Sequence, residues 1–151
     1  MPQDAISLLK QDHDHVRKLL DELTETGDRA VKTRKDLLEK VGRELRAHTR
    51  IEEEVLYPAF HEKGHKEEEK MYHEAMEEHR AVDDLVLPDL EKTDPGSREF
   101  AGRAKVLKEL LEHHVEEEES EMFPKMRELF DDEQLVSMGD EMAQLKRKIL
   151  H

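Results

Sequence analysis

The chain has 151 residues, of which 42% are charged and 4% aromatic, and its formal net charge is −14. This acidic balance argues against a nucleic-acid partner, whose phosphates are bound by Lys and Arg, and against an anionic membrane surface. No cysteine is present, which excludes disulfides, thiolate zinc sites and iron–sulfur clusters. The length predicts one domain over residues 1–151. The absence of a signal pattern or a long apolar run predicts a cytoplasmic location with no membrane partner.

Four long stretches carry the apolar pattern of helices that face a core. Apolar residues recur at spacings of three and four over residues 6–23, 38–59, 72–86 and 104–118. This periodicity predicts amphipathic helices and argues against disorder, in spite of the high charge. The stretches are separated by Thr26-Gly27-Asp28, by Gly64 and by Asp94-Pro95-Gly96-Ser97, and Pro88 ends or kinks the third helix.

The short connections favour an all-α fold, an up-down-up-down four-helix bundle over about residues 3–130. A fifth, shorter apolar stripe over residues 135–149 follows Asp131-Asp132. It predicts an additional C-terminal helix at about 132–150. We expect this helix to pack on the bundle or on a partner, either a second copy of the chain or another protein.

A set of polar residues on the apolar stripes is repeated along the chain. His13, His48 and Glu52 recur as His79, His114 and Glu118, each 66 positions later (79 − 13, 114 − 48 and 118 − 52). The sequence around them repeats too, since Tyr-Pro at 57–58 is matched by Phe-Pro at 123–124. The repeat predicts two similar helical hairpins related by a pseudo-two-fold axis, which brings both sets together in the bundle centre.

Four imidazoles and two carboxylates in a core have the composition of a two-metal site. Buried carboxylates are usually paired or bound to metal, because desolvating their charge costs several kcal/mol. His and Glu at positions i and i+4 lie one turn apart on one helical face. The Glu side chains can bridge two metals while neutral imidazoles cap them, and such ligands suit iron or manganese. The alternative is a buried polar network without metal.

Other polar residues near this set receive less weight. The acidic residues beside the ligand Glu positions are interpreted as a solvated face: Glu53, Glu54, Glu119 and Glu121. For Glu53 and Glu119, contact with outer partners of the ligands stays open as the alternative. The remaining histidines are expected at the surface: His15, His61, His65, His73, His113 and His151. Asp83 copies the i+4 geometry from His79, but its repeat mate is Arg17, so symmetry does not support it as a ligand. In a straight helix Tyr57 points about 180° away from His48, but a bend at Pro58 would leave a metal-facing or redox-active phenol open.

These motifs resemble the hemerythrin-like family in its bacterial HHE-domain branch, over roughly residues 3–130. The matching motifs are Asp12-His13, His48-x-x-x-Glu52 with Tyr57-Pro58, Glu78-His79, and His114-x-x-x-Glu118 with Phe123-Pro124. The resemblance implies a non-haem pair of iron ions with an oxo or hydroxo bridge. It implies that His13 and His48 cap one iron, that His79 and His114 cap the other, and that Glu52 and Glu118 bridge them. Manganese or zinc could substitute for the iron.

The chain departs from the oxygen-carrying members of that family. Their third helix has His-x-x-x-His, where this chain has Ala75, and their fourth has His-x-x-x-x-Asp in place of His-x-x-x-Glu. One imidazole is missing, which leaves open positions for solvent, peroxide or nitric oxide and argues against a stable oxygen carrier. Two functions remain: a protein that binds or senses dioxygen or nitric oxide, and an enzyme with peroxidase, catalase-like or nitric-oxide-metabolising activity. Iron homeostasis is a third and weaker one.

Overall fold

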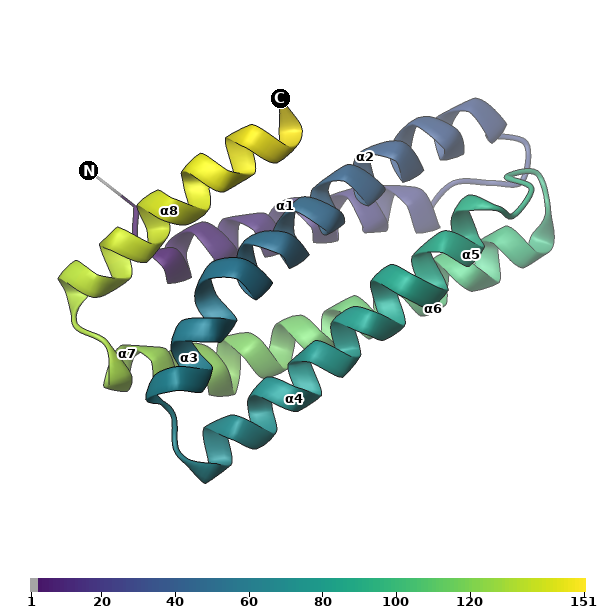
Figure 1. The fold of residues 1–151 in the computed structure, drawn as a ribbon. Helices are drawn as coiled ribbons and strands as arrows, with labels where there is room; N and C mark the ends of the chain where they lie inside the picture. Colours follow the sequence, from purple (N-terminus) through teal and green to yellow (C-terminus); the bar gives the residue numbers. More distant parts are fainter. Residues whose placement is uncertain (1–2) are drawn as a thin grey trace.

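The computed structural model describes residues 3–151, and every regular element in that range is helical. The bundle consists of four long helical segments, called arms below. The first arm is α1 (Ala5–Thr24), and the second is α2 (Val31–Ile51) continued by η1 (Glu52–Leu56) and α3 (Tyr57–Lys63). The third is α4 (Lys66–Arg80) continued by η2 (Ala81–Val86) and α5 (Leu87–Glu91), and the fourth is α6 (Arg98–Glu117) continued by η3 (Glu118–Met122) and α7 (Phe123–Leu129). A last helix, α8, spans Asp132–Leu150. The arms run up and down beside one another (Figure 1). The predicted four-helix bundle with an additional C-terminal helix is therefore confirmed.

The helices begin where local chemistry favours it. Asp4 accepts a hydrogen bond from the Ser7 N–H at the start of α1, and Ser97 accepts one from Phe100 at the start of α6. Asp131 and Gln134 form a reciprocal capping box that starts α8. Such caps satisfy backbone N–H groups that have no partner within the helix.

The three segments η1, η2 and η3 are π-helical turns, and each ends two residues before a proline. The N–H of Tyr57 donates to the carbonyl of Glu52, and that of Phe123 donates to the carbonyl of Glu118, five residues back in both cases. Proline lacks an N–H and its ring clashes with the carbonyl four residues earlier. Widening the preceding turn lets the arm continue through the proline. The extra residue also rotates everything that follows by about 100°.

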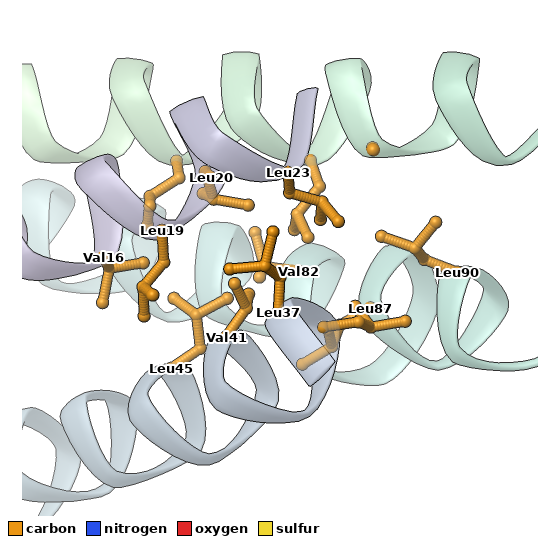
Figure 2. Close-up of a cluster of buried hydrophobic side chains, with 14 of the residues drawn as sticks. Val16, Leu19, Leu20, Leu23, Leu37, Val41, Leu45, Val82, Leu87 and Leu90 are labelled. Carbon is orange, nitrogen blue, oxygen red and sulfur yellow. The ribbon is translucent and has the colours of Figure 1, made fainter. Parts of the chain in front are cut away.

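Buried apolar side chains form two separate clusters along the bundle. One lies toward the end closed by the loops at 25–30 and 92–97, and Figure 2 shows its leucines and valines converging from several helices. The other lies among α3, α7, α8 and the start of α1. On α1 the order is Leu9 from the second cluster, then His13, then Val16 from the first. The predicted ligands therefore form a polar layer between two apolar ones.

Helix α8 packs on the bundle itself, against α1 and α2 (Figure 1). Leu135 and Met142 bury their side chains in the second apolar cluster. Gly139 allows a close approach, because a Cβ there would lie 2.3 Å from the carbonyl oxygen of Gln3. Among residues 3–151, no helix is both long and apolar enough to cross a membrane.

Arg34 is a buried cation that ties the two loops at the closed end of the bundle. It donates to the Thr26 hydroxyl at 2.9 Å, to the Thr26 carbonyl at 3.0 Å and to the Pro95 carbonyl at 2.6 Å. Its guanidinium also lies 5.0 Å from the ring centroid of Phe100. One side chain therefore supplies donors to backbone carbonyls of both loops and holds them together.

We expect Arg34→Met to lower the free energy of unfolding by about 2–4 kcal/mol, because it removes the donors for these carbonyls. Urea unfolding followed by circular dichroism would measure the change. Arg29→Met is the matched control, since Arg29 is exposed, and it should change the stability by about 0.5 kcal/mol or less. Equal stabilities for the two variants would contradict this role for Arg34.

Candidate metal centre

The structure brings all six predicted ligands into one buried layer. Each has 6% or less of its surface exposed. One ligand atom from each of His13, His48, Glu52 and Glu118 lies within 4.8 Å of the others, and a second group joins Glu52 with His79 and His114. Glu52 belongs to both groups. The layer therefore contains two adjacent positions where a cation could be held.

The two halves of the layer have similar distances between imidazole nitrogens and carboxylate oxygens. Glu118 Oε1 lies 3.1 Å from His13 Nε2, and Glu52 Oε1 lies 3.0 Å from His79 Nε2. Within the helices, Nε2 of His48 and His114 each lie 3.2 Å from the carboxylate four residues later. Each carboxylate therefore faces one imidazole from its own arm and one from the opposite hairpin. This is the arrangement expected of a bridging ligand.

Each of the four imidazoles has its outer nitrogen bonded to a second carboxylate. The Nδ1 atom of His48 lies 3.1 Å from Asp12, and that of His114 lies 2.7 Å from Glu78. An ionised carboxylate only accepts hydrogen bonds, so each Nδ1–H donates. Nε2 is then left to face the centre of the layer, which is how outer carboxylates orient imidazole ligands in metal sites.

The other two outer carboxylates correct the interpretation of Glu53 and Glu119 as part of a solvated face. Glu119 accepts from His13 Nδ1 at 2.7 Å, and Glu53 accepts from His79 Nδ1 at 3.1 Å. Both carboxylates are partly buried. The repeat contained a signal for them, because Glu53 and Glu119 are also 66 positions apart (119 − 53). Their partners lie on other helices, which a helix-by-helix analysis does not show.

Tyr57 lies in the site, in contrast to the direction predicted from a straight helix. Its hydroxyl donates to Glu118 Oε2 at 2.9 Å and lies 3.2 Å from His79 Nε2 and 3.3 Å from His114 Nε2. The π turn η1 inserts one residue between Glu52 and Tyr57, and the resulting rotation turns the phenol inward. Tyr57 is fully buried. The phenol therefore lies beside His79 and His114, and it donates to Glu118, which belongs to the group with His13 and His48.

The repeat mate of Tyr57 breaks the pseudo-two-fold symmetry. Phe123 occupies the equivalent position and stacks on His13, with ring centroids 5.8 Å apart and planes 4° from parallel. A phenyl ring offers no hydrogen bond. The half with His13 and His48 is therefore more apolar, and the two positions for cations are chemically different.

Asp83 and the remaining histidines lie outside both groups of ligand atoms. Asp83 is half-buried beside this layer, and its Oδ1 has no hydrogen-bond partner. Burial is the main cause that raises its pKa. The other six histidines are all exposed, as the sequence predicted.

Without a cation, protons on the imidazoles compensate the negative charge of the buried carboxylates. Burial acts to lower the pKa of His48, but Glu52 and Asp12 outweigh it and raise this pKa to about 10. Burial also acts to lower the pKa of His79, but Glu52 and Glu53 outweigh it and raise this pKa to about 9. The pKa of His114 is also raised, by Glu118 above all, against the effect of burial. A metal must therefore displace protons from these imidazoles.

Two buried atoms in the layer have no well-aligned hydrogen bond: His48 Nε2, which lies 3.2 Å from Glu52 Oε1, and Glu52 Oε2. Unpaired buried polar atoms are rare in native proteins, and they often mark a place where an ion or a water molecule binds. Both atoms belong to the group that could hold a cation. Four imidazole nitrogens and two carboxylates around them fit a pair of first-row transition metals.

A small pocket of about 20 Å³, enough for about one water molecule, lies between the layer and the surface. Its lining includes Ala75, His114 and Glu118 together with Met71 and Met122. Ala75 stands where the oxygen carriers of the resembled family have an additional His. The small side chain leaves room beside His114 and Glu118, so a small ligand can reach the layer at that point.

Comparison with known proteins places this helical bundle and its His/Glu layer in a family. Residues 4–126 match the family described as the hemerythrin HHE cation binding domain. The chain belongs to this hemerythrin HHE family, and metal-cation binding is the property that defines the domain.

Two relatives are similar over most of the chain. The crystal structure of a hemerythrin HHE cation binding domain-containing protein from Mycobacterium kansasii superposes with a TM-score of 0.83 and 28% identity, covering 97% of this chain and 87% of that one. A protein from a Nostoc species named DNA nickase is 30% identical in an alignment of 145 positions that covers 94% of this chain. The chain spans only 39% of the length of that curated relative.

Proposed function

We propose that the chain is a non-haem di-iron protein that binds or senses dioxygen or nitric oxide at an open position of its metal pair. The observation that carries this proposal is the pocket beside Ala75, which reaches His114 and Glu118. In this proposal His13 and His48 would hold one iron, His79 and His114 would hold the other, and Glu52 and Glu118 would be shared between them. When bound, a ferrous pair would supply the electrons for binding or reducing a small ligand.

The residues around the pair control access and orientation. The outer carboxylates fix the imidazoles through Nδ1, and the apolar clusters on both sides limit solvent. The Tyr57 hydroxyl lies beside the half that the pocket reaches. There it can donate a hydrogen bond to a bound ligand, which is a feature of both a sensor and a reactive centre.

The test is to load the protein with ferrous iron without oxygen, to count the iron, and to record absorption while dioxygen is added and removed. We expect about two irons per chain and a visible absorption change that reverses when the gas is removed. Binding of fewer than two irons would overturn the di-iron assignment. An irreversible change would exclude reversible binding of dioxygen and favour the second candidate.

The second candidate is an enzyme at the same layer, with peroxidase, catalase-like or nitric-oxide-metabolising activity. The observation in its favour is the missing imidazole at Ala75, since an open position together with a nearby phenol suits turnover. Peroxide consumption and nitric oxide consumption by the iron-loaded protein separate the two candidates. DNA nicking is not proposed for this chain, because a net charge of −14 opposes binding to phosphates.

Filling the pocket should slow access to the metals. We expect Ala75→His to lower the rate of reaction with peroxide or nitric oxide by about tenfold or more, equivalent to roughly 1.4 kcal/mol in the barrier, while iron is retained. The new imidazole would occupy space beside His114 and Glu118. Stopped-flow absorption measures the rate.

Ala75→Leu is the matched control, because it fills the same pocket without adding a nitrogen. Slowing in both variants would assign the effect to blocked access. Slowing in Ala75→His alone would assign it to an additional ligand. Unchanged rates in both variants would contradict the role of this pocket.

A further inference from the structure

The outer carboxylates Asp12 and Glu78 are repeat mates with different surroundings. Glu78 Oε2 faces the exposed imidazole of His113 at 3.4 Å. Asp12 is buried, and its Oδ1 accepts from the ammonium of Lys146 at 2.5 Å. Lys146 belongs to α8, the helix outside the repeat. Of these two carboxylates, only the one that orients His48 is therefore connected to the C-terminal helix.

The connection is a chain of direct contacts. Lys146 Nζ bonds to Asp12 Oδ1, and Asp12 Oδ2 bonds to His48 Nδ1 at 3.1 Å. Lys146 also lies 3.7 Å from Glu44 on α2. A buried carboxylate needs a charged partner to offset its desolvation. Lys146 supplies that charge while leaving the second oxygen of Asp12 free to orient the imidazole.

The packing of α8 holds the lysine in place. Gly139 lies so close to the start of α1 that a side chain there would collide with the backbone of Gln3 and Asp4. At the other end of α8, Arg43 of α2 donates to the Leu150 carbonyl at 2.9 Å. Met142, one turn before Lys146, is fully buried. The position of Lys146 therefore depends on the docking of the whole helix.

We infer that Lys146 is a positioning residue, through which the docking of α8 on the bundle fixes Asp12 and His48 and so selectively tightens one of the two metal positions. This inference rests on the proposed metal pair. Outer partners of metal-bound imidazoles typically change metal affinity by about 10–100-fold when removed. No bond in this chain reaches His79 or His114, so we expect the position that they form to be affected less.

The test compares Lys146→Met with Lys148→Met, since Lys148 is an exposed lysine on the same helix. Each protein is loaded with cobalt(II), and the release of cobalt to a chelator is followed by absorption. We expect the wild type and Lys148→Met to hold two cobalt ions. In Lys146→Met one of the two should be about 10–100-fold weaker. Lys146→Arg, which keeps the charge, should restore most of the difference.

Two results would overturn the inference. Release of both ions at wild-type rates from Lys146→Met would show that the lysine has no influence. Equal weakening of both ions would indicate general loosening of the bundle. Gly139→Leu is the second variant, because it displaces α8 while keeping Lys146, and we expect the same selective weakening of one ion.

A readout without metal keeps the inference separate from the proposed function. Imidazole NMR signals of the metal-free protein report the Nδ1–H bond of each histidine directly. We expect Lys146→Met to shift the signal of His48 and to leave that of His114 unchanged. Unchanged His48 signals would overturn the inference. Failure of the wild type to bind two cobalt ions would instead contradict the proposed function.

Discussion

His114→Ala should remove metal and lower the free energy of unfolding by about 3–5 kcal/mol. His114 is almost fully buried, and its ring connects Glu78 through Nδ1 with Glu118 through Nε2. Its Nε2 also lies 3.2 Å from that of His79. Truncation removes one predicted ligand and takes an imidazole partner away from both Glu78 and Glu118. Because Glu118 is 1% exposed, water cannot replace the imidazole without opening the layer.

The neighbouring histidine provides the control for this prediction. His113 is exposed and contacts Glu117 at 3.0 Å, a surface ion pair of the kind that contributes little. His113→Ala should therefore keep its metal and change the stability by about 0.5 kcal/mol or less. Elemental analysis measures the metal, and urea unfolding measures the stability. Equal metal content in His114→Ala and the wild type would reject His114 as a ligand.

The repeat in the sequence was sufficient to predict the inner layer. Residues at one offset and in one helical phase must meet when two similar hairpins pack around a common axis. The residues His13 and His79 illustrate this, since each faces the carboxylate of the opposite hairpin. The loops at Gly64 and at 94–97 were likewise predictable, because they end apolar stripes.

Three features depended on geometry that a helical wheel does not contain. Tyr57 faces the His/Glu layer because a π turn precedes Pro58 and adds about 100° of rotation. Glu119 reaches His13 across the bundle, 106 residues away in sequence. Lys146 is similar, because its contact with Asp12 spans 134 residues and lies outside the repeat. The sequence predicts which residues share a helical face, but the packing decides which neighbour each side chain reaches.

The metal-free protein should lose stability as the pH rises from about 7 to 9. In the unfolded chain the histidines lose their protons near pH 6.5. In the folded chain His48 keeps its proton until the pH approaches about 10, and His79 until about 9. The folded state therefore binds more protons than the unfolded state in this window. Each such histidine should lower the free energy of unfolding by up to about 1.4 kcal/mol per pH unit.

Urea unfolding of chelator-treated protein at pH 7, 8 and 9 measures this slope. His48→Gln is the informative variant, because it removes one of the retained protons, so its slope should be smaller by about one proton per molecule. His15→Gln is the matched control at an exposed position and should keep the wild-type slope. A stability that is constant or rises between pH 7 and 9 in the metal-free wild type would contradict the proton-compensated layer.

The contribution of bound metal to the free energy of unfolding should change with pH in the opposite direction. The same imidazole nitrogens hold either protons or metal, so binding releases protons and becomes tighter as the pH rises. The stabilisation by metal should therefore grow between pH 7 and 9, while the metal-free protein weakens. A metal-free stability that falls with pH, together with a stabilisation by metal that rises with pH, would be difficult to obtain from a polar network without a metal function. In such a network protons would be the only compensation for Glu52 and Glu118, and added metal would leave the slope unchanged.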